Sequence, residues 1–372
     1  MNIGRTLGES FSGAATYLIN AYLCHIIYDI FAMKQILSTF FGVLLTSALM
    51  AQGQVPKLKT IPFSDIRGVS VGNAQDDAAG TGVTVFRLTV PGCAAVEVFG
   101  GGPASRETEV IAVERNHPIN ALVFSGGSAY GLAASCGVAR CLEEHGVGYE
   151  TGSALVPLVC QSCIYDLGYR SATVRPDEEM GYAACEASFT ANNPLSGSVG
   201  SGTGATVGKA AGIALAQKAG IGYAAVQMGP LQIGVAVVLN SYGDIFYRGK
   251  KIAGMQSDEA DSYTTLLQTA EENLFIATPS GTTNTTLVAI FTNGDFTPAQ
   301  LKHLSQMASA GLARSISPAF TTADGDTVYA ISVGPDEEKV PANLNAVGAL
   351  SASMVEEAIA DAVYSAGPLL LR

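Results

Sequence analysis

Short apolar runs recur along the chain after residue 56, and glycine or small polar residues bound most of them. Runs of this kind, with β-branched residues and flanking turn formers, are typical of strands in a buried or half-buried sheet. The pattern predicts strands at GVTVFRL (82–88), AAVEVFG (94–100), NALVFSGG (120–127), ALVPLVC (154–160), GVAVVLN (234–240), LVAIFTN (287–293) and TVYAISVG (327–334).

Helical periodicity fills several intervals between these runs. Thr297 followed by Pro298 is a favourable N-cap and first helical position. The mixture of strands and helices favours an α/β (α+β) fold whose helices cover the outer faces of its sheets. The predicted helices lie at 129–145, 204–219, 298–315 and 346–365.

The N-terminal residues are expected to form a leader. The stretch MKQILSTFFGVLLTSALMAQGQ has a lysine, an apolar run and small residues in the order typical of a secretory signal peptide cleaved near Ala51. We expect a signal at 33–51, an upstream extension at 1–32 that precedes the biological start, and export to the periplasm. The alternative is a transmembrane anchor over roughly residues 16–50.

Composition narrows the class of protein. The chain has 372 residues, 48% hydrophobic and 14% charged, so it can bury a large core and is not disordered. No linker-like stretch interrupts it after residue 56, and we expect a single domain at 52–372. The formal net charge of −12 argues against nucleic acid, because phosphate binding needs clustered lysine and arginine. A small molecule or peptide is the expected partner.

Six cysteines follow the predicted signal, and their spacing is not that of a small disulfide scaffold. Cys160 and Cys163 form a C-x-x-C motif, but no second pair accompanies it and the surrounding segment, VPLVCQSCIYDL, is apolar. A redox role needs a low-pKa thiolate at a helix start, which this pattern does not indicate. We therefore expect buried free thiols.

Motifs for nucleotide binding and for two common hydrolase types are incomplete. GSGTGATVGKAAG is glycine-rich, but Lys209 is followed by alanine where a P-loop carries the Ser or Thr that binds magnesium. FSGGSAYG has Tyr130 where the nucleophile elbow around Ser128 needs glycine. The four histidines lie in no motif of a Ser-His-Asp triad or a zinc site. The sequence thus predicts no cofactor and no metal.

The stretch GTTNTTLVAIFTN (281–293) runs from a small polar cluster directly into a predicted strand. It fits a polar turn, a glycosylation acceptor at Asn284, or a threonine placed as a nucleophile. A threonine at a newly cut N-terminus can use its own α-amine as base, since the reference pKa near 7.7–8.0 leaves a useful fraction neutral at pH 7. Thr285, at the opening of the strand, is suitably placed for this role.

Further motifs occur together along the chain: IPFSDIRGVSVGN (61–73), TGVTV (81–85), GGGPASRET (100–108), SGGSAYGL (125–132), VPLVCQSCIYDL (156–167), GSGTGATVGK (200–209) and NTTLVAIFTN (284–293). Together they resemble the peptidases that include L-aminopeptidase D-amidase/esterase, β-peptidyl aminopeptidases and nylon-oligomer hydrolases. The resemblance covers nearly the whole chain after the predicted signal.

The resemblance implies a four-layer αββα sandwich of the type found in ornithine acetyltransferases, and a precursor that cuts itself between Asn284 and Thr285. The products would be a larger chain, 52–284, and a smaller chain, 285–372, which stay associated. Thr285 would then attack the carbonyl of a small peptide or amide, and water would release the acyl group. Family members act without metal or cofactor, and they commonly form tetramers of the two-chain unit.

Supporting residues are implied by position within the same resemblance. Asp324 and Asp326 match a pair that holds the amine and hydroxyl of the nucleophile, and Lys209 matches a lysine of the nylon hydrolases. Asn240 and Tyr165 match groups that stabilise the oxyanion. Each also has a structural alternative: a tight turn for the aspartates, a helix-start surface residue for Lys209, a turn former for Asn240 and a strand aromatic for Tyr165.

The chain departs from parts of this family. Its nucleophile would be threonine where the aminopeptidases commonly use serine, and Gln161 and Ser162 stand where the β-peptide enzymes carry a glutamate for the substrate amine. Two other functions remain open: acyl transfer of the ornithine acetyltransferase type, and a secreted binding protein that lacks the chemistry.

Overall fold

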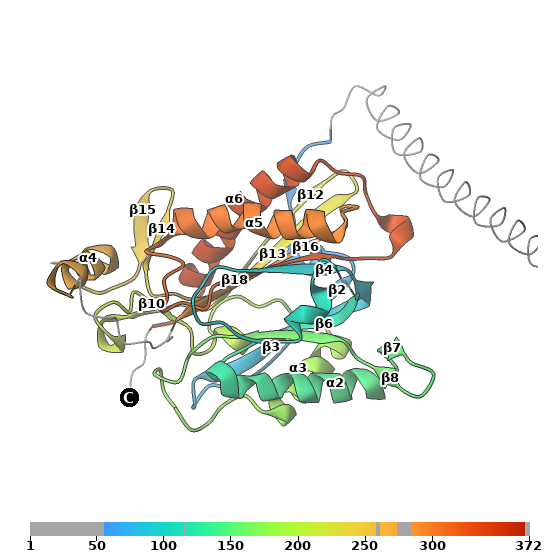
Figure 1. The fold of residues 1–372 in the computed structure, drawn as a ribbon, viewed down its shortest axis with the longest axis horizontal. Coiled ribbons are helices and arrows are strands. Elements are labelled where there is room, and N and C mark those ends of the chain that lie inside the picture. The colour runs from blue at the N-terminus through green and yellow to red at the C-terminus, as the bar shows by residue number, and fades with distance from the viewer. Residues whose placement is uncertain (1–55, 115–116, 258–260, 274–283, 369–372) are drawn as a thin grey trace, which may run out of the picture. The chain divides into compact units, whose positions relative to one another are not determined.

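The computed structural model describes residues 56–114, 117–257, 261–273 and 284–368 (Figure 1). The chain divides into two compact units, Met1–Pro56 and Lys57–Arg372, and the sheets and helices belong to the second. The predicted signal at 33–51 and the extension at 1–32 lie outside the described residues. Among the helices that the structure describes, none combines the length and apolar character needed to span a bilayer.

The larger sheet has six strands in the order β1-β12-β13-β16-β18-β4. Its neighbours are antiparallel except for β16 and β18, which run parallel. The strands are β1 (Lys59–Thr60), β12 (Ile221–Met228), β13 (Leu231–Asn240), β16 (Thr285–Thr292), β18 (Thr327–Ser332) and β4 (Ala94–Val98).

The second sheet has five strands in the order β2-β3-β6-β9-β5, with β6 and β9 parallel and the other pairs antiparallel. Three short ribbons lie outside the two main sheets: β10 with β11, β7 with β8, and β14 between β15 and β17. The strands of the second sheet are β2 (Val69–Asp76), β3 (Thr81–Gly92), β6 (Ile119–Ser125), β9 (Val159–Cys163) and β5 (Ala104–Arg106). The ribbons consist of β7 (Tyr149–Glu150), β8 (Leu155–Val156), β10 (Thr206–Val207), β11 (Gln217–Lys218), β14 (Asp244–Tyr247), β15 (Lys250–Ala253) and β17 (Ile316–Ser317).

Helices cover the outer faces of both sheets (Figure 1). The helices α5 and α6 pack on the six-stranded sheet, and α2 and α3 pack on the five-stranded one. The two sheets face each other between these helical layers, which makes the four-layer αββα sandwich and confirms the predicted fold class. The helices are α2 (Ala134–Glu144), α3 (Glu178–Thr190), α4 (Ser262–Asn273), α5 (Pro298–Ser315) and α6 (Leu344–Tyr364).

Strand β16 shows why this architecture needs an unbroken apolar strand. Leu287, Ala289 and Phe291 point into the cluster between the two sheets, while Val288 and Ile290 point into the cluster under α5 and α6. Successive side chains of a strand alternate between faces, and both faces of β16 are covered. The alternating residues of β16 thus belong to two separate hydrophobic cores.

Most predicted elements are present, and the capping role of Thr297 is confirmed by its hydrogen bond from the backbone N–H of Gln300. The run at 154–160 is divided into β8 and β9 around Pro157, which has no N–H to donate to a ladder. Helices α3 and α4 and strand β12 were not predicted.

The predicted helix at 204–219 is wrong. The segment instead forms β10, a 3-10 turn at Ile213–Leu215 and β11. Gly208 and Gly212 have φ values of 73° and 93°, in the left-handed region that an α-helix excludes. At Gly208 a side chain would also meet the backbone nitrogen of Met255 at 2.0 Å. Close packing against this neighbouring backbone determines the conformation of Gly208.

One polar contact joins the two sheets within their shared core. The hydroxyls of Ser162 on β9 and Tyr329 on β18 lie 2.7 Å apart, and both residues are buried. We predict that Tyr329→Phe and Ser162→Ala each lower the free energy of unfolding by about 1–3 kcal/mol, because each leaves the other hydroxyl buried without its partner. The double variant should lose less unfolding free energy than the two single variants lose in sum. Denaturant unfolding of the three variants measures these losses.

Tyr223→Phe is the matched control for this cycle. The Tyr223 hydroxyl is buried without a hydrogen-bond partner among the described residues, so its removal should leave stability unchanged or higher. Additive single effects for Ser162 and Tyr329 would contradict the inter-sheet hydrogen bond.

Candidate active site

Thr285 is the first residue of β16 and is almost completely buried, with 4% of its surface exposed. It pairs with Asn240, the last residue of the neighbouring antiparallel strand β13. Its hydroxyl donates a hydrogen bond to the backbone carbonyl of Asn284. The sheet register thus places a hydroxyl, a peptide bond and an amide side chain at one strand end.

The Asn284 carbonyl receives a second donor from the turn before β18. Asn284 forms a parallel bridge with Asp324, and the N–H of Gly325 donates to the Asn284 oxygen at 2.9 Å. A side chain at Gly325 would lie 2.8 Å from the Thr285 hydroxyl oxygen, so this turn contacts the hydroxyl closely. The Thr285 hydroxyl and the Gly325 amide therefore converge on one peptide carbonyl.

The two aspartates beside Gly325 are buried and accept hydrogen bonds from backbone amides. Asp326 accepts from the N–H of Thr286 at 2.6 Å and from the N–H of Phe320 at 3.1 Å. Asp324 accepts from the N–H and the hydroxyl of Thr321 and from the N–H of Tyr242. These bonds fix both carboxylates beside the start of β16.

Burial and mutual repulsion alter the acidity of this pair. Burial, followed by the charge of Asp324, raises the pKa of Asp326 to about 7. Burial also raises the pKa of Asp324, although the hydrogen bond from Thr321 opposes that shift. At least one of the two can thus hold a proton near neutral pH.

Lys209 places a buried amine beside Asn240. Its amine donates to the Asn240 side-chain oxygen at 2.7 Å and to the Asn240 backbone carbonyl at 3.1 Å. Burial lowers the pKa of Lys209 to about 7, while Asp324, Asp166 and Asp326 oppose this change. The residue lies in a glycine-rich turn beside β10, so the predicted alternative of a surface residue at a helix start is wrong.

Asn240 links Lys209 to the opposite sheet. Its side-chain oxygen also accepts from the N–H of Thr206 at 3.1 Å, and its side-chain nitrogen donates to the backbone carbonyl of Tyr165 at 2.9 Å. Tyr165 follows β9, so this hydrogen bond connects the ends of two strands in different sheets. The hydrogen bond from Asn240 uses the backbone carbonyl of Tyr165, whereas the resemblance implied that Tyr165 stabilises the oxyanion.

Sequence reasoning missed a buried acid next to Tyr165. Asp166 accepts from the Thr81 hydroxyl and the Gly127 N–H, each at 2.7 Å, and burial raises its pKa to about 6. It therefore ties the SGGSAYGL loop to the segment carrying Tyr165. In the sequence, Thr81, Gly127 and Asp166 each lie within one of the motifs of the family resemblance, and no other signal marked them.

Gln161 and Ser162 both make hydrogen bonds in the protein interior. Gln161 is fully buried, donates to the Ser125 hydroxyl and the Gly131 carbonyl, and accepts from the Ser135 N–H. Ser162 bonds Tyr329 in the inter-sheet core.

The expectation of buried free thiols is confirmed at Cys160 and Cys163, where burial raises the pKa of each thiol to about 12.

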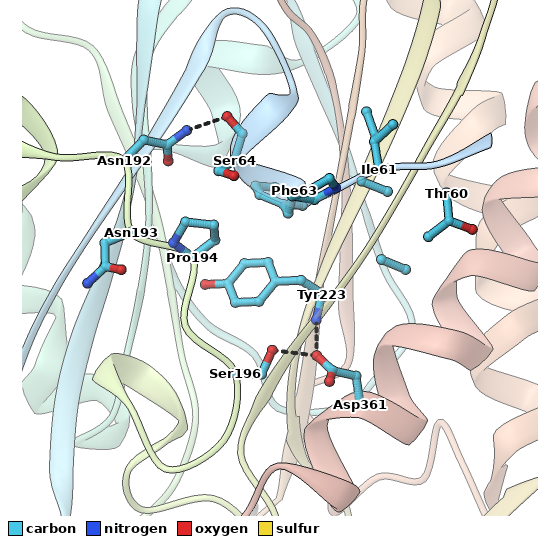
Figure 2. Close-up of a pocket in the computed structure, with 13 residues that line it drawn as sticks. Thr60, Ile61, Phe63, Ser64, Asn192, Asn193, Pro194, Ser196, Tyr223 and Asp361 are labelled. Atoms are coloured by element: carbon cyan, nitrogen blue, oxygen red, sulfur yellow. Dashed lines mark hydrogen bonds between the residues drawn. The ribbon is translucent and has the colours of Figure 1, made fainter.

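A pocket of about 450 Å³ lies elsewhere on the sandwich (Figure 2). Figure 2 shows Phe63, Tyr223, Ser196 and Asp361 on its wall, with the Asp361 carboxylate accepting from the Tyr223 N–H at 2.9 Å and from the Ser196 hydroxyl. None of the six predicted site residues lines it. The pocket is therefore separate from the cluster around Thr285.

Comparison with known proteins identifies the family of this chain. The model of "Peptidase family S58" matches residues 62–370. An uncharacterized aminopeptidase of Mycobacterium leprae is 36% identical, covering 76% of this chain and 81% of its own. A 6-aminohexanoate-oligomer endohydrolase of Kocuria sp. is 30% identical, covering 82% of this chain and 86% of its own.

Solved structures with the same fold include two aminopeptidases. The L-aminopeptidase D-Ala-esterase/amidase of Ochrobactrum anthropi, described as a variant of the Ntn hydrolase fold, has a TM-score of 0.63 at 22% identity and covers 84% of this chain and 89% of its own. A β-aminopeptidase of Burkholderia sp. has a TM-score of 0.59 at 21% identity and covers 84% and 90%. The chain belongs to peptidase family S58 and is an amidohydrolase of that family.

Proposed function

We propose that the protein is a self-processing hydrolase whose nucleophile is the N-terminal threonine left by a cut between Asn284 and Thr285. The observation that carries the proposal is the convergence of the Thr285 hydroxyl and the Gly325 N–H on the Asn284 carbonyl. Its substrates are small peptides or peptide-like amides.

Self-cleavage begins with attack by the Thr285 oxygen on the carbonyl carbon of Asn284. The peptide nitrogen takes a proton as the C–N bond breaks, so that an ester links Asn284 to the Thr285 side chain and the α-amine is released. Water then hydrolyses the ester. The Gly325 N–H stabilises the negative charge that develops on the Asn284 oxygen, as an oxyanion-hole donor does.

The uncut chain needs a base other than the α-amine, because that nitrogen is still part of the peptide bond. The buried pair Asp324 and Asp326 flanks Gly325 and can take up or release a proton near neutral pH. We assign the transfer of the Thr285 hydroxyl proton to this pair.

Turnover uses the new N-terminus. The α-amine of Thr285 takes the hydroxyl proton, the oxygen attacks the substrate carbonyl, and the leaving amine departs with a proton before water releases the acid. An amide side chain has two N–H donors, so Asn240 can bond Tyr165 and still donate to the substrate oxyanion. Lys209 holds the Asn240 oxygen and so orients those donors, and we assign the Tyr165 hydroxyl to the same oxyanion.

The relatives support amide chemistry, since they include a protein named as an aminopeptidase and one named as an oligomer endohydrolase. We further propose export to the periplasm, from the signal-like stretch at 33–51, and a homo-oligomer of two-chain units, from the family resemblance. Neither changes the chemistry assigned to Thr285.

The first prediction concerns the nucleophile. Wild-type protein should give two bands on a denaturing gel, and Thr285→Ala should give one full-length band and lose at least about 1,000-fold in amide hydrolysis. Thr285→Ser keeps a hydroxyl and should still be cut. An uncut wild-type chain with full activity would exclude the mechanism, and acyl transfer to an added amine that outruns hydrolysis would make the enzyme an acyltransferase.

A second prediction concerns the Gly325 amide. Gly325→Ala places a methyl group against the Thr285 hydroxyl and should slow self-cleavage by about 10²–10³-fold through misaligned attack and a displaced donor. Pulse-labelled chain followed on a gel gives the rate. Gly168→Ala is the control, because a side chain there meets open space. Equal cleavage rates in the two variants would remove Gly325 from the mechanism.

A third prediction follows from the pKa of Lys209. Between about pH 7 and 10.5 the amine is mostly neutral in the folded chain and charged in the unfolded one, so the unfolded state binds more protons and this residue's contribution to stability rises with pH. Both chains are compared in a Thr285→Ala background. From pH 7.5 to pH 9.5, the free energy of unfolding of the chain with Lys209, measured in urea, should rise by about 1–3 kcal/mol relative to that of Lys209→Met. A pH-independent difference would contradict the burial of this amine.

A further inference from the structure

The outer helices of the five-stranded sheet carry a cluster that the proposed reaction does not use. Cys141 lies on α2, and His145 caps the end of that helix four residues later, so both side chains face the same side. Glu186 lies on the neighbouring helix α3. The three residues bring a thiol, an imidazole and a carboxylate together between two helices.

The ligand atoms are already close to the spacing of a metal site. One potential ligand atom from each of Cys141, His145 and Glu186 lies within 4.8 Å of the other two. The ring nitrogen Nε2 of His145 is 2.7 Å from the oxygen Oε1 of Glu186, and the sulfur of Cys141 is 3.6 Å from the same oxygen. In a tetrahedral zinc site with bonds of about 2.0–2.3 Å, such atoms stand roughly 3.3–3.6 Å apart. Small side-chain rotations would therefore suffice.

The surroundings hold these ligands in place. The imidazole of His145 stacks on Phe189, with ring centroids 3.8 Å apart. The thiol of Cys141 is fully buried, whereas the side chains of His145 and Glu186 are 36% and 39% exposed. The buried thiol and the stacked imidazole thus have fixed positions, and the partly exposed side chains of His145 and Glu186 leave the site accessible to an ion from solvent.

The three groups have the chemistry to bind a dication. A bound metal would replace the thiol proton of Cys141, which leaves to solvent, and the thiolate and the Glu186 carboxylate would together balance the charge of the metal.

We propose that Cys141, His145 and Glu186 form a site for zinc that joins α2 to α3. Sulfur and nitrogen ligands with one carboxylate favour zinc over magnesium or calcium, which prefer oxygen. The metal is structural and takes no part in the reaction assigned to Thr285.

The test is metal binding by the purified protein. After treatment with a chelator and dialysis against micromolar zinc, wild type should retain one zinc per chain and unfold at a higher temperature than the zinc-free protein. Cobalt in place of zinc should give a thiolate charge-transfer band. Cys141→Ser should abolish that band, and Glu186→Gln should weaken zinc binding by more than about 10-fold.

Cys136→Ser is the matched control, because Cys136 is an exposed cysteine on the same helix and should leave zinc binding unchanged. Glu186 is partly exposed, so its variant also reports on the site if Cys141→Ser fails to fold. Less than stoichiometric zinc in wild type, or wild-type zinc binding in both Cys141→Ser and Glu186→Gln, would overturn the proposal. Self-cleavage at Thr285 is read separately on a gel, so either proposal can fail alone.

Discussion

A peptide carbonyl at the start of β16 is held by two donors in a place closed to water. The Thr285 hydroxyl and the Gly325 N–H both bond the Asn284 oxygen, and Thr285 is almost fully buried. Buried polar groups need such partners, because an unmade hydrogen bond costs about 1–3 kcal/mol. The requirement couples β16 to the turn before β18, and the apolar residues that follow in β16 anchor both to two cores.

The same dry setting shifts the ionisable groups around Thr285 toward neutrality. Burial raises the pKa of Asp326 and lowers that of Lys209, each to about 7, so proton exchange near neutral pH is accessible to both. Their arrangement does not depend on a single strand. Asn240 ends β13, Lys209 lies beside β10, and the Tyr165 carbonyl follows β9 in the other sheet. The sandwich is what brings these groups together.

The local pattern of apolar residues was enough to predict the strands that are covered on both faces, because a short apolar run such as LVAIF is typical of a buried strand. It failed at 204–219, where glycine conformations and packing against the Met255 backbone override an apparent helical period. The site residues came from family resemblance, since groups as far apart in the sequence as Tyr165 and Asn240 meet only after folding. The Gly325 amide was missed because a backbone donor leaves no mark in the sequence beyond the glycine itself.

The account rests on Thr285 becoming an N-terminus that carries the acyl group. Intact-mass spectrometry of the enzyme quenched during turnover of a small amide tests this directly. The account predicts a fragment that begins at Thr285 and, in part of the population, carries the mass of the substrate acyl group. A fragment beginning at another residue, or an adduct confined to the larger chain, would contradict it.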